Sequence, residues 1–433
     1  MLKNVLIFTE AATKFNTPLY LYDENIISEK CKEVLSMPNA YGLKVRYAMK
    51  ANSNKTLLRL ITNKGLSIDA SSLDECRRAY DAGIPYDKIM LTTQEVPLGD
   101  DREYLEKIIL KGLKYNICSL RQLSLIADFA SKNNIPLSMR IHPGVGSGES
   151  STRNTGDKYS CFGIHLADIK KALEFSDSKN LFFDQVHVHI GSGGDTQKWR
   201  ENIDRELEFV EEYFSNIKIV NFGGGLKEAR MPGEICAEIN ELGLYAKNKI
   251  EEFYRETGRK LIMEIEPGTY IVANAGYLIT KVIDKKQTGE DGFKFIITDG
   301  GMEVNSRPFI YGSQHPFYII SKDGEILSSE NNLINLDSER DKHVIVGKCC
   351  ESGDSQSLDN NGNIVPRIMA DPKIGDYIVI GGCGAYCSSM TPFNYNSHRQ
   401  VPEILLREND ELCLIRKRQS LNQITQNEVL LDL

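Results

Sequence analysis

Five features of this chain could take part in catalysis. Each of them lies at or near the end of a short apolar run. Lys50 ends the run YAMK, Asp69 lies late in LSIDAS, and His189 ends HVH. The glycines Gly223–Gly225 follow IVNF, and Glu266 ends LIMEIE. If these runs are parallel β-strands of a barrel, their carboxyl ends meet at one face, where barrel enzymes carry their catalytic groups. The shared position therefore predicts one active site.

Each of these features also has an ordinary structural explanation. A Lys that follows an apolar strand usually extends its charged end to solvent, and three glycines in a row are often only a turn. His187 and His189 share a strand face and could bind a metal ion, but the sequence shows no third ligand. We therefore expect no metal at this position.

Taken together, the same residue types meet the chemical needs of pyridoxal phosphate. Backbone N–H groups of a glycine-rich segment at the end of a barrel strand can hold a phosphate. A buried Lys can form a Schiff base. A carboxylate beside a pyridine nitrogen keeps it protonated, which makes the ring an electron sink. The combination predicts pyridoxal 5'-phosphate as the cofactor.

Eight β-rich runs alternate with helical patterns, which favours a TIM-like (β/α)₈ barrel. The runs are VRYAMK (45–50), LSIDAS (66–71), KIMLTT (88–93), LKYNIC (113–118), LSMRIH (137–142), QVHVHI (185–190), IKIVNF (217–222) and LIMEIE (261–266). Between two of them, SSLDECRRAYDAG begins with a Ser cap and stops at Gly83, as helices do. An open doubly wound sheet would not need eight repeats, and no G-x-G-x-x-G follows the first strand. We expect the cofactor-binding barrel over residues 28–275.

The pattern changes after Gly276, where helical periodicity mostly disappears. The β-rich runs that follow are GYLITKVID, FKFIITDGG, HVIVGKC, GDYIVIGG and EILLREND, with Gly, Asp and Asn at the turns. They predict a mainly antiparallel β domain over residues 276–433. The strand expected in TPLYLYD (17–23) would complete this domain, so residues 1–27 are assigned to it as well.

Composition limits the partners and the location. A chain of 433 residues is long enough for two domains. The net charge of -8 argues against a nucleic-acid partner. No run approaches the roughly 20 apolar residues that a membrane helix needs, and the N-terminus lacks a signal-peptide pattern, so we expect a cytoplasmic protein. The ten cysteines are expected to be reduced and mostly buried, and Cys383 and Cys387 form only a weak metal signal without nearby His partners.

The sequence resembles the fold-type III decarboxylases, which use pyridoxal phosphate, and among them diaminopimelate decarboxylase. The resemblance covers nearly the whole chain and rests on blocks in the family order, namely TPLYLYD, YAMKAN, HIGS, FGGG, EPG...IVANAG, DGG, RPFIY, CCESGD and GAYCSSM...YN. It implies that Lys50 forms the Schiff base, that His189 stacks on the cofactor ring and that Glu266 pairs with the pyridine nitrogen. It also implies that the phosphate is held at Ser192, Gly224, Gly225 and Gly268. The acidic residues Asp69 and Glu75 would lie near the lysine.

The resemblance extends to residues of the β domain. Cys350 and Glu351 match the CES motif, whose loop reaches into the partner's barrel in this family, so a homodimer with shared active sites is implied. Cys350 would protonate the α-carbon after CO₂ leaves. Arg307 and Tyr311 match substrate-binding residues, and Tyr386 matches a tyrosine that contacts both the cofactor and the substrate.

The implied reaction is decarboxylation of a diamino acid, meso-diaminopimelate to L-lysine in the family pattern. Relatives usually read EPGR, and that Arg holds the distal carboxylate, whereas Thr269 follows EPG here. The block CFG (161–163) and the sequence after HIGS depart from the family as well. A D-lysine, D-ornithine or other amino-acid substrate is therefore a rival, with Glu351 available for a distal ammonium. Arg307 could replace the missing Arg for diaminopimelate.

Three other classes of function remain open. A catalytically inactive regulatory homologue is one, although the presence of Lys50, Glu266 and Cys350 together disfavours it. A racemase is the second, and Glu266 disfavours it because the related alanine racemases have an arginine at the ring nitrogen. The third is a metal-dependent barrel hydrolase built on His187 and His189.

Overall fold

The computed structural model describes residues 5–144, 146, 155–191, 195–331, 340–359 and 361–433. The chain divides into two compact units. The barrel unit comprises Ser28–Glu228 and Ile235–Ile271, and the β unit comprises Met1–Ile27, Ala229–Glu234 and Val272–Leu433.

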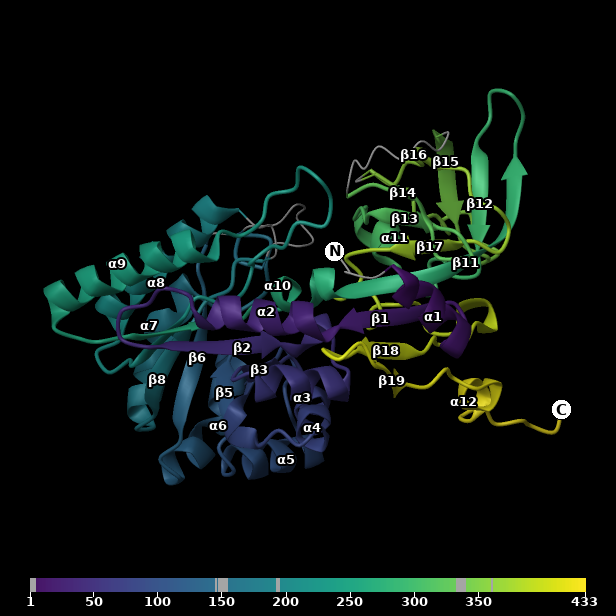
Figure 1. Cartoon of the computed structure of the whole chain (residues 1–433). Coiled ribbons are helices and arrows are strands. Elements are labelled where there is room, and N and C mark those ends of the chain that lie inside the picture. The colour runs from purple at the N-terminus through teal and green to yellow at the C-terminus, as the bar shows by residue number, and fades with distance from the viewer. Residues whose placement is uncertain (1–4, 145, 147–154, 192–194, 332–339, 360) are drawn as a thin grey trace. The chain divides into compact units, whose positions relative to one another are not determined.

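The barrel unit is built on a closed parallel sheet (Figure 1). Within the described residues this sheet has nine strands in the order β5-β4-β3-β2-β10-β9-β8-β6-β7, and a further pairing of β5 with β6 closes the ring. The eight barrel strands are β2 (Leu43–Ala48), β3 (Ser67–Ala70), β4 (Ile89–Thr92), β5 (Lys114–Ile117), β6 (Pro136–His142), β8 (Phe182–His187), β9 (Ile219–Asn221) and β10 (Ile262–Ile265). Each overlaps one predicted run, so the (β/α)₈ prediction is confirmed. The short β7 (Ile164–His165) pairs with β6 outside the ring.

Helices alternate with these strands (Figure 1). They are α2 (Glu24–Leu35), α3 (Lys55–Asn63), α4 (Leu73–Asp81), α5 (Asp100–Ile109), α6 (Leu120–Lys132), α7 (Leu166–Ser178), α8 (Thr196–Tyr213), α9 (Ile239–Thr257) and the single turn α10 (Thr269–Val272). The predicted Ser cap of α4 is confirmed, because the Ser72 hydroxyl accepts a hydrogen bond from the Glu75 N–H at 3.1 Å. Such caps fix where each helix begins, and hence where the preceding strand must end.

The β unit contains a second sheet, which is mostly antiparallel, as predicted. Its described strands are β1 (Leu19–Asp23), β11 (Gly276–Gln287), β12 (Lys294–Thr298), β13 (Phe317–Ile320), β14 (Ile326–Ser329), β15 (Arg340–Val346), β16 (Arg367–Ala370), β17 (Tyr377–Ile380), β18 (Glu403–Leu406) and β19 (Leu412–Arg416). The N-terminal strand completes the sheet, because β1 lies between β11, antiparallel to it, and β18, parallel to it. The pair β12 and β15 is also parallel.

Helix α1 (Leu6–Phe15) precedes β1 and was not among the expected elements. Its residues Ile7, Phe8, Ala11 and Ala12 lie on one face and are buried in the core of the β unit. Two further short helices are α11 (Arg307–Tyr311) and α12 (Leu421–Thr425). Among the described helices, none is both long and apolar enough to cross a bilayer.

Candidate active site

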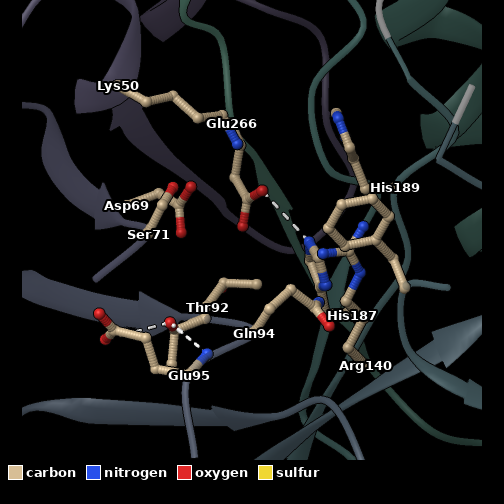
Figure 2. Close-up of a pocket in the computed structure, with 12 residues that line it drawn as sticks. Lys50, Asp69, Ser71, Thr92, Gln94, Glu95, Arg140, His187, His189 and Glu266 are labelled. Atoms are coloured by element: carbon tan, nitrogen blue, oxygen red, sulfur yellow. Dashed lines mark hydrogen bonds and ion pairs between the residues drawn. The ribbon is translucent and has the colours of Figure 1, made fainter. Parts of the chain in front are cut away.

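A cavity of about 310 Å³ opens at the carboxyl ends of the barrel strands (Figure 2). Its size is at the lower end of the range for small-molecule sites. The residues that line it are Lys50, Asp69, Ser71, Thr92, Thr93, Gln94, Glu95, Arg140, Phe162, His187, His189 and Glu266. Four residues predicted from strand ends, Lys50, Asp69, His189 and Glu266, therefore meet in one cavity.

Lys50 and Asp69 reach the cavity from neighbouring strands. Lys50 lies in the 3-10 turn η1 (Met49–Ala51), directly after β2, and Figure 2 shows its side chain extending toward Glu266. Asp69 lies in β3 and is almost fully buried. Burial raises the pKa of Asp69 well above its ordinary value, and repulsion from Glu266 adds to this, while Lys50 opposes it. Asp69 therefore tends to hold a proton.

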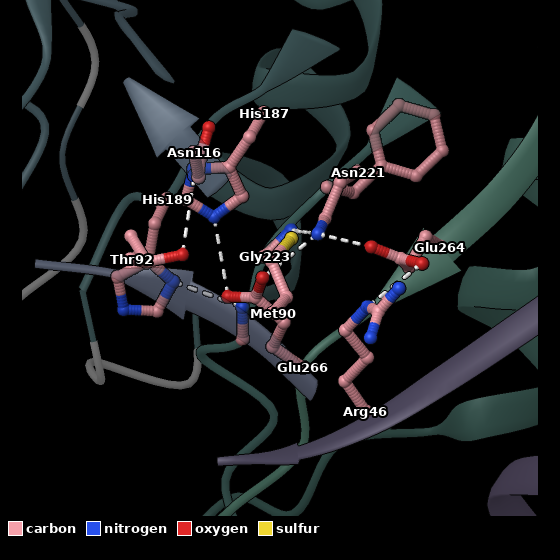
Figure 3. Close-up of polar contacts among 12 residues, drawn as sticks. Arg46, Met90, Thr92, Asn116, His187, His189, Asn221, Gly223, Glu264 and Glu266 are labelled. Carbon is pink, nitrogen blue, oxygen red and sulfur yellow. Dashed lines mark hydrogen bonds and ion pairs between the residues drawn. The ribbon is translucent and has the colours of Figure 1, made fainter. Parts of the chain in front are cut away.

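Glu266 follows β10 and is held by two donors (Figures 2 and 3). Its Oε2 lies 3.1 Å from His187 Nε2, and its Oε1 accepts a hydrogen bond from Asn221 Nδ2 at 2.7 Å. Burial alone would raise the pKa of Glu266. The contact with His187 and the nearby His189 and Lys50 outweigh burial and lower this pKa to about 2. Glu266 is therefore a buried anion, which suits it to pair with a protonated ring nitrogen.

His189 is oriented by the glycine segment after β9. Its Nδ1 accepts a hydrogen bond from the Gly224 N–H at 2.9 Å, so this nitrogen carries no proton. Burial lowers the pKa of His189 well below its ordinary value, and the positive charges of Lys50 and Arg140 lower it further. The imidazole is therefore neutral.

Close packing requires glycine at positions 224 and 225 and leaves little room for a side chain at Gly268. A Cβ on Gly224 would lie 2.6 Å from the carbonyl oxygen of Glu266, and one on Gly225 would lie 2.5 Å from the carbonyl oxygen of Gly191. Gly268 packs against the turn that carries Lys50, since its Cβ would lie 3.2 Å from the Cβ atoms of Ala48 and Ala51. Ser192, the fourth predicted phosphate contact, lies outside the described residues.

Several residues of the cavity were not singled out from the sequence. Arg140 is the clearest, because it is 6% exposed and its Nη2 has no hydrogen-bond partner among the described residues. A charged residue inside the apolar run LSMRIH was an available signal for it. Gln94 follows β4 in a loop, and no pattern marks it. Glu75, expected near the lysine, accepts a hydrogen bond from the Ser71 N–H at 2.7 Å. Burial raises the pKa of Glu75, while this hydrogen bond and the nearby positive charge of Lys50 oppose the rise.

The β unit holds the remaining predicted residues in two groups. In the first, the Arg307 guanidinium lies 5.6 Å from the Tyr311 ring and 5.8 Å from the Tyr386 ring. The second group is Cys350 and Glu351, which are both exposed. The Gly353 N–H and the Tyr395 and Ser352 hydroxyls donate to Glu351 and lower its pKa.

The expectation that Cys383 and Cys387 have no His partner was wrong. His315, distant in sequence, places Nδ1 3.6 Å from Cys383 Sγ, and ligand atoms of all three buried residues lie within 4.8 Å of one another. The same Nδ1 lies 2.9 Å from the Gly381 carbonyl oxygen, and Arg230 and Arg307 add positive charge beside Cys387. All ten cysteines are free, as expected, but only five of them are buried.

Comparison with known proteins agrees with this geometry. The family model described as "Pyridoxal-dependent decarboxylase, pyridoxal binding domain" matches residues 25–273. The diaminopimelate decarboxylase of Escherichia coli K12 is 32% identical over 96% of this chain and 95% of its own length. The chain belongs to the pyridoxal-dependent decarboxylase family. It is therefore a pyridoxal-phosphate-dependent carboxy-lyase.

Solved structures of decarboxylases extend the match to the whole fold. A crystal structure of a diaminopimelate decarboxylase superposes with a TM-score of 0.86 at 30% identity, over 98% of this chain and 96% of that one. The Helicobacter pylori diaminopimelate decarboxylase complexed with L-lysine gives a TM-score of 0.79 at 26% identity, over 97% and 99% of the two chains. Both units of this decarboxylase thus belong to one known architecture.

Proposed function

We propose that this decarboxylase removes CO₂ from a diamino acid, with meso-diaminopimelate as the substrate and L-lysine as the product. The observation that carries the proposal is the cavity in which Lys50, His189 and Glu266 meet, in a chain that resembles diaminopimelate decarboxylases over nearly its whole length. The reaction belongs to lysine biosynthesis.

The residues of the cavity fit pyridoxal 5'-phosphate. Asp69 Oδ1 and Arg140 Nη2 are buried polar atoms without hydrogen-bond partners among the described residues, as expected where a polar ligand binds. Lys50 would hold the cofactor covalently and Glu266 would face its ring nitrogen. The phosphate would be held by Ser192, Gly224, Gly225 and Gly268. The bound cofactor supplies an electron sink for the carbon that loses CO₂.

The residues of the chain would then act through their protonation states. Glu266 is held as an anion and would keep the ring nitrogen protonated, while the neutral His189 would stack on the ring without adding charge. Lys50 would bind the cofactor through its side-chain amine. Cys350 would donate the proton that replaces CO₂ at the α-carbon, because a thiol can act as a general acid.

The same proposal extends to the assembly and the location. Cys350 and Glu351 would act in the barrel of a second copy, so the enzyme would be a homodimer with shared active sites. Arg307, Tyr311 and Tyr386 would contact the substrate. We place the domain boundaries at 28–275 for the barrel and at 1–27 with 276–433 for the β domain. A cytoplasmic location is part of the same proposal. The net charge of -8 argues against a nucleic-acid partner.

Thr269 favours a second candidate substrate class. This half-buried residue is the first of α10, where diaminopimelate decarboxylases usually carry the Arg that holds the distal carboxylate. A D-diamino acid without that carboxylate, such as D-lysine or D-ornithine, would not need the missing contact. Glu351 could bind its distal ammonium instead.

The test is CO₂ release by the cofactor-loaded enzyme from meso-diaminopimelate, D-lysine, D-ornithine and their L forms. We expect the highest kcat/KM with meso-diaminopimelate and no release by Lys50→Ala. A preference for a D-diamino acid would contradict meso-diaminopimelate as the substrate, but the reaction would still be decarboxylation. Racemisation without CO₂ release would refute decarboxylation. No turnover of any of these amino acids despite bound cofactor would refute both candidate substrate classes and would point to another amino acid or to a regulatory role.

A further inference from the structure

Two buried carboxylates point into the same side of the barrel. Glu264 and Glu266 lie two positions apart at the end of β10, so their side chains share one face. Glu264 is 0% exposed and Glu266 is 5% exposed. Two anions in a low-dielectric interior repel each other, and unless something intervenes one of them takes up a proton.

Asn221, at the end of the neighbouring strand β9, lies between these carboxylates (Figure 3). Its Nδ2 donates to Glu266 Oε1 at 2.7 Å and to Glu264 Oε1 at 2.8 Å. One amide group thus uses its two protons to join the two carboxylates, and each of them gains a donor that favours its ionised form.

The orientation of the Asn221 side chain is fixed from the other side. Its Oδ1 accepts a hydrogen bond from the Gly223 N–H at 2.9 Å, which forces Nδ2 to face the carboxylates. The backbone N–H of Asn221 donates to Glu206 Oε1 at 3.1 Å, and its carbonyl accepts from the Val188 N–H at 2.9 Å. Rotation of the amide would break the bond to Gly223 and place an oxygen against two anions.

Glu264 is in turn held by residues of two other strands, and Figure 3 shows one of them, Arg46, beside it. Arg46 Nε on β2 lies 3.0 Å from Glu264 Oε2, and Gln185 Nε2 on β8 donates to Glu264 Oε1 at 2.8 Å. Arg46 supplies the opposite charge that a buried carboxylate needs. The Glu264 side chain is therefore held in place, and Asn221 is locked against it.

We propose that Asn221 is a positioning residue that fixes both the direction and the ionised state of Glu266 toward the cofactor's ring nitrogen. This inference rests on the proposed function. Without the amide, Glu266 loses a charge-assisted hydrogen bond and faces Glu264 directly. The pKa of Glu266 then rises, although His187, His189 and Lys50 still lower it, and Glu266 holds a proton on the ring nitrogen less firmly.

The test uses Asn221→Leu and Asn221→Ser in the dimeric holoenzyme, loaded with cofactor that carries ¹⁵N in the ring. The ¹⁵N chemical shift reports whether the ring nitrogen is protonated, and it is measured across the pH range in which each protein stays folded. We expect a pyridinium shift in the wild type at every pH. Both variants should move toward the unprotonated pyridine value as the pH rises. Their kcat should fall about 10- to 100-fold with a smaller change in KM.

Asn116→Ala is the matched control. Asn116 is also a fully buried asparagine inside the barrel, but its partners are Thr92 and Ser138 rather than a carboxylate. We expect this control to keep the wild-type ¹⁵N shift. Wild-type shifts in both Asn221 variants would overturn the positioning role of Asn221 alone. An unprotonated ring nitrogen in the wild type, or no bound cofactor, would instead overturn the proposed function.

Discussion

At the scale of single residues, the site separates two carboxylates by their surroundings. Glu266 contacts His187 and lies near positive charge, and its pKa falls to about 2, whereas burial and repulsion raise the pKa of Asp69. Such opposed shifts in neighbouring acids suit them to different roles in one site. This difference in pKa arises because the charged groups around the two carboxylates lie in or directly after four different strands, β2, β3, β8 and β10.

The lowered pKa of Glu266 predicts a specific acid sensitivity. A carboxyl with a lower pKa in the folded state stabilises the fold above its unfolded pKa of about 4.5. That stabilisation is lost as the pH falls from about 4.5 toward about 2. In urea unfolding, the free energy of unfolding of the wild type should therefore fall more steeply across this window than that of Glu266→Gln. The exposed Glu103→Gln should follow the wild-type slope, and equal slopes for Glu266→Gln would contradict the prediction.

Thr269→Arg tests substrate choice directly. An Arg at this position would restore a charge-assisted contact to a distal carboxylate. The ratio of kcat/KM for meso-diaminopimelate to kcat/KM for D-lysine should therefore rise about tenfold or more. Thr269→Ala serves as the control and should leave the ratio near the wild-type value. An unchanged ratio in Thr269→Arg would mean that another group, such as Arg307, already holds the carboxylate.

At the scale of elements, the start of α4 connects β3 to the cavity. Ser72 caps this helix, and the Glu75 side chain accepts from the N–H of Ser71, a residue that lines the cavity. Ser72→Ala should lower the free energy of unfolding by about 1 kcal/mol because the Glu75 N–H loses its acceptor. Urea denaturation measures the free energy of unfolding of this variant and of the wild type. Ser124→Ala on the exposed face of α6 should change stability by less than about 0.5 kcal/mol, and an equal loss in both variants would argue against a capping effect.

The barrel strands could be predicted because parallel strands buried on both faces read as apolar runs. The strand-end rule then located Lys50 and Glu266. Helix α1 was not foreseen, since its ten residues make a short apolar stretch whose helical face becomes evident only against the core of the β unit. Asn221 and His315 were not recognised either, because their roles depend on partners that only the fold brings near.

At the scale of the whole molecule, the proposed chemistry draws on both units. The barrel unit contains Lys50, His189 and Glu266, and under the proposal the β unit would contribute Cys350. If Cys350 serves the barrel of a second copy, each active site takes residues from two chains. A symmetric dimer of this kind contains two equivalent sites.

Mixed dimers of Lys50→Ala and Cys350→Ala subunits distinguish a shared site from a site within one chain. Each variant alone should be inactive. After random reassortment of equal amounts, half of the dimers are mixed, and each mixed dimer has one site with both Lys50 and Cys350 intact. CO₂ release should therefore recover to about a quarter of the wild-type value. If both residues serve the same chain, no mixed dimer has an intact site and activity stays absent, although size-exclusion chromatography would still show dimers. Recovery near a quarter thus requires that Cys350 acts across the subunit interface.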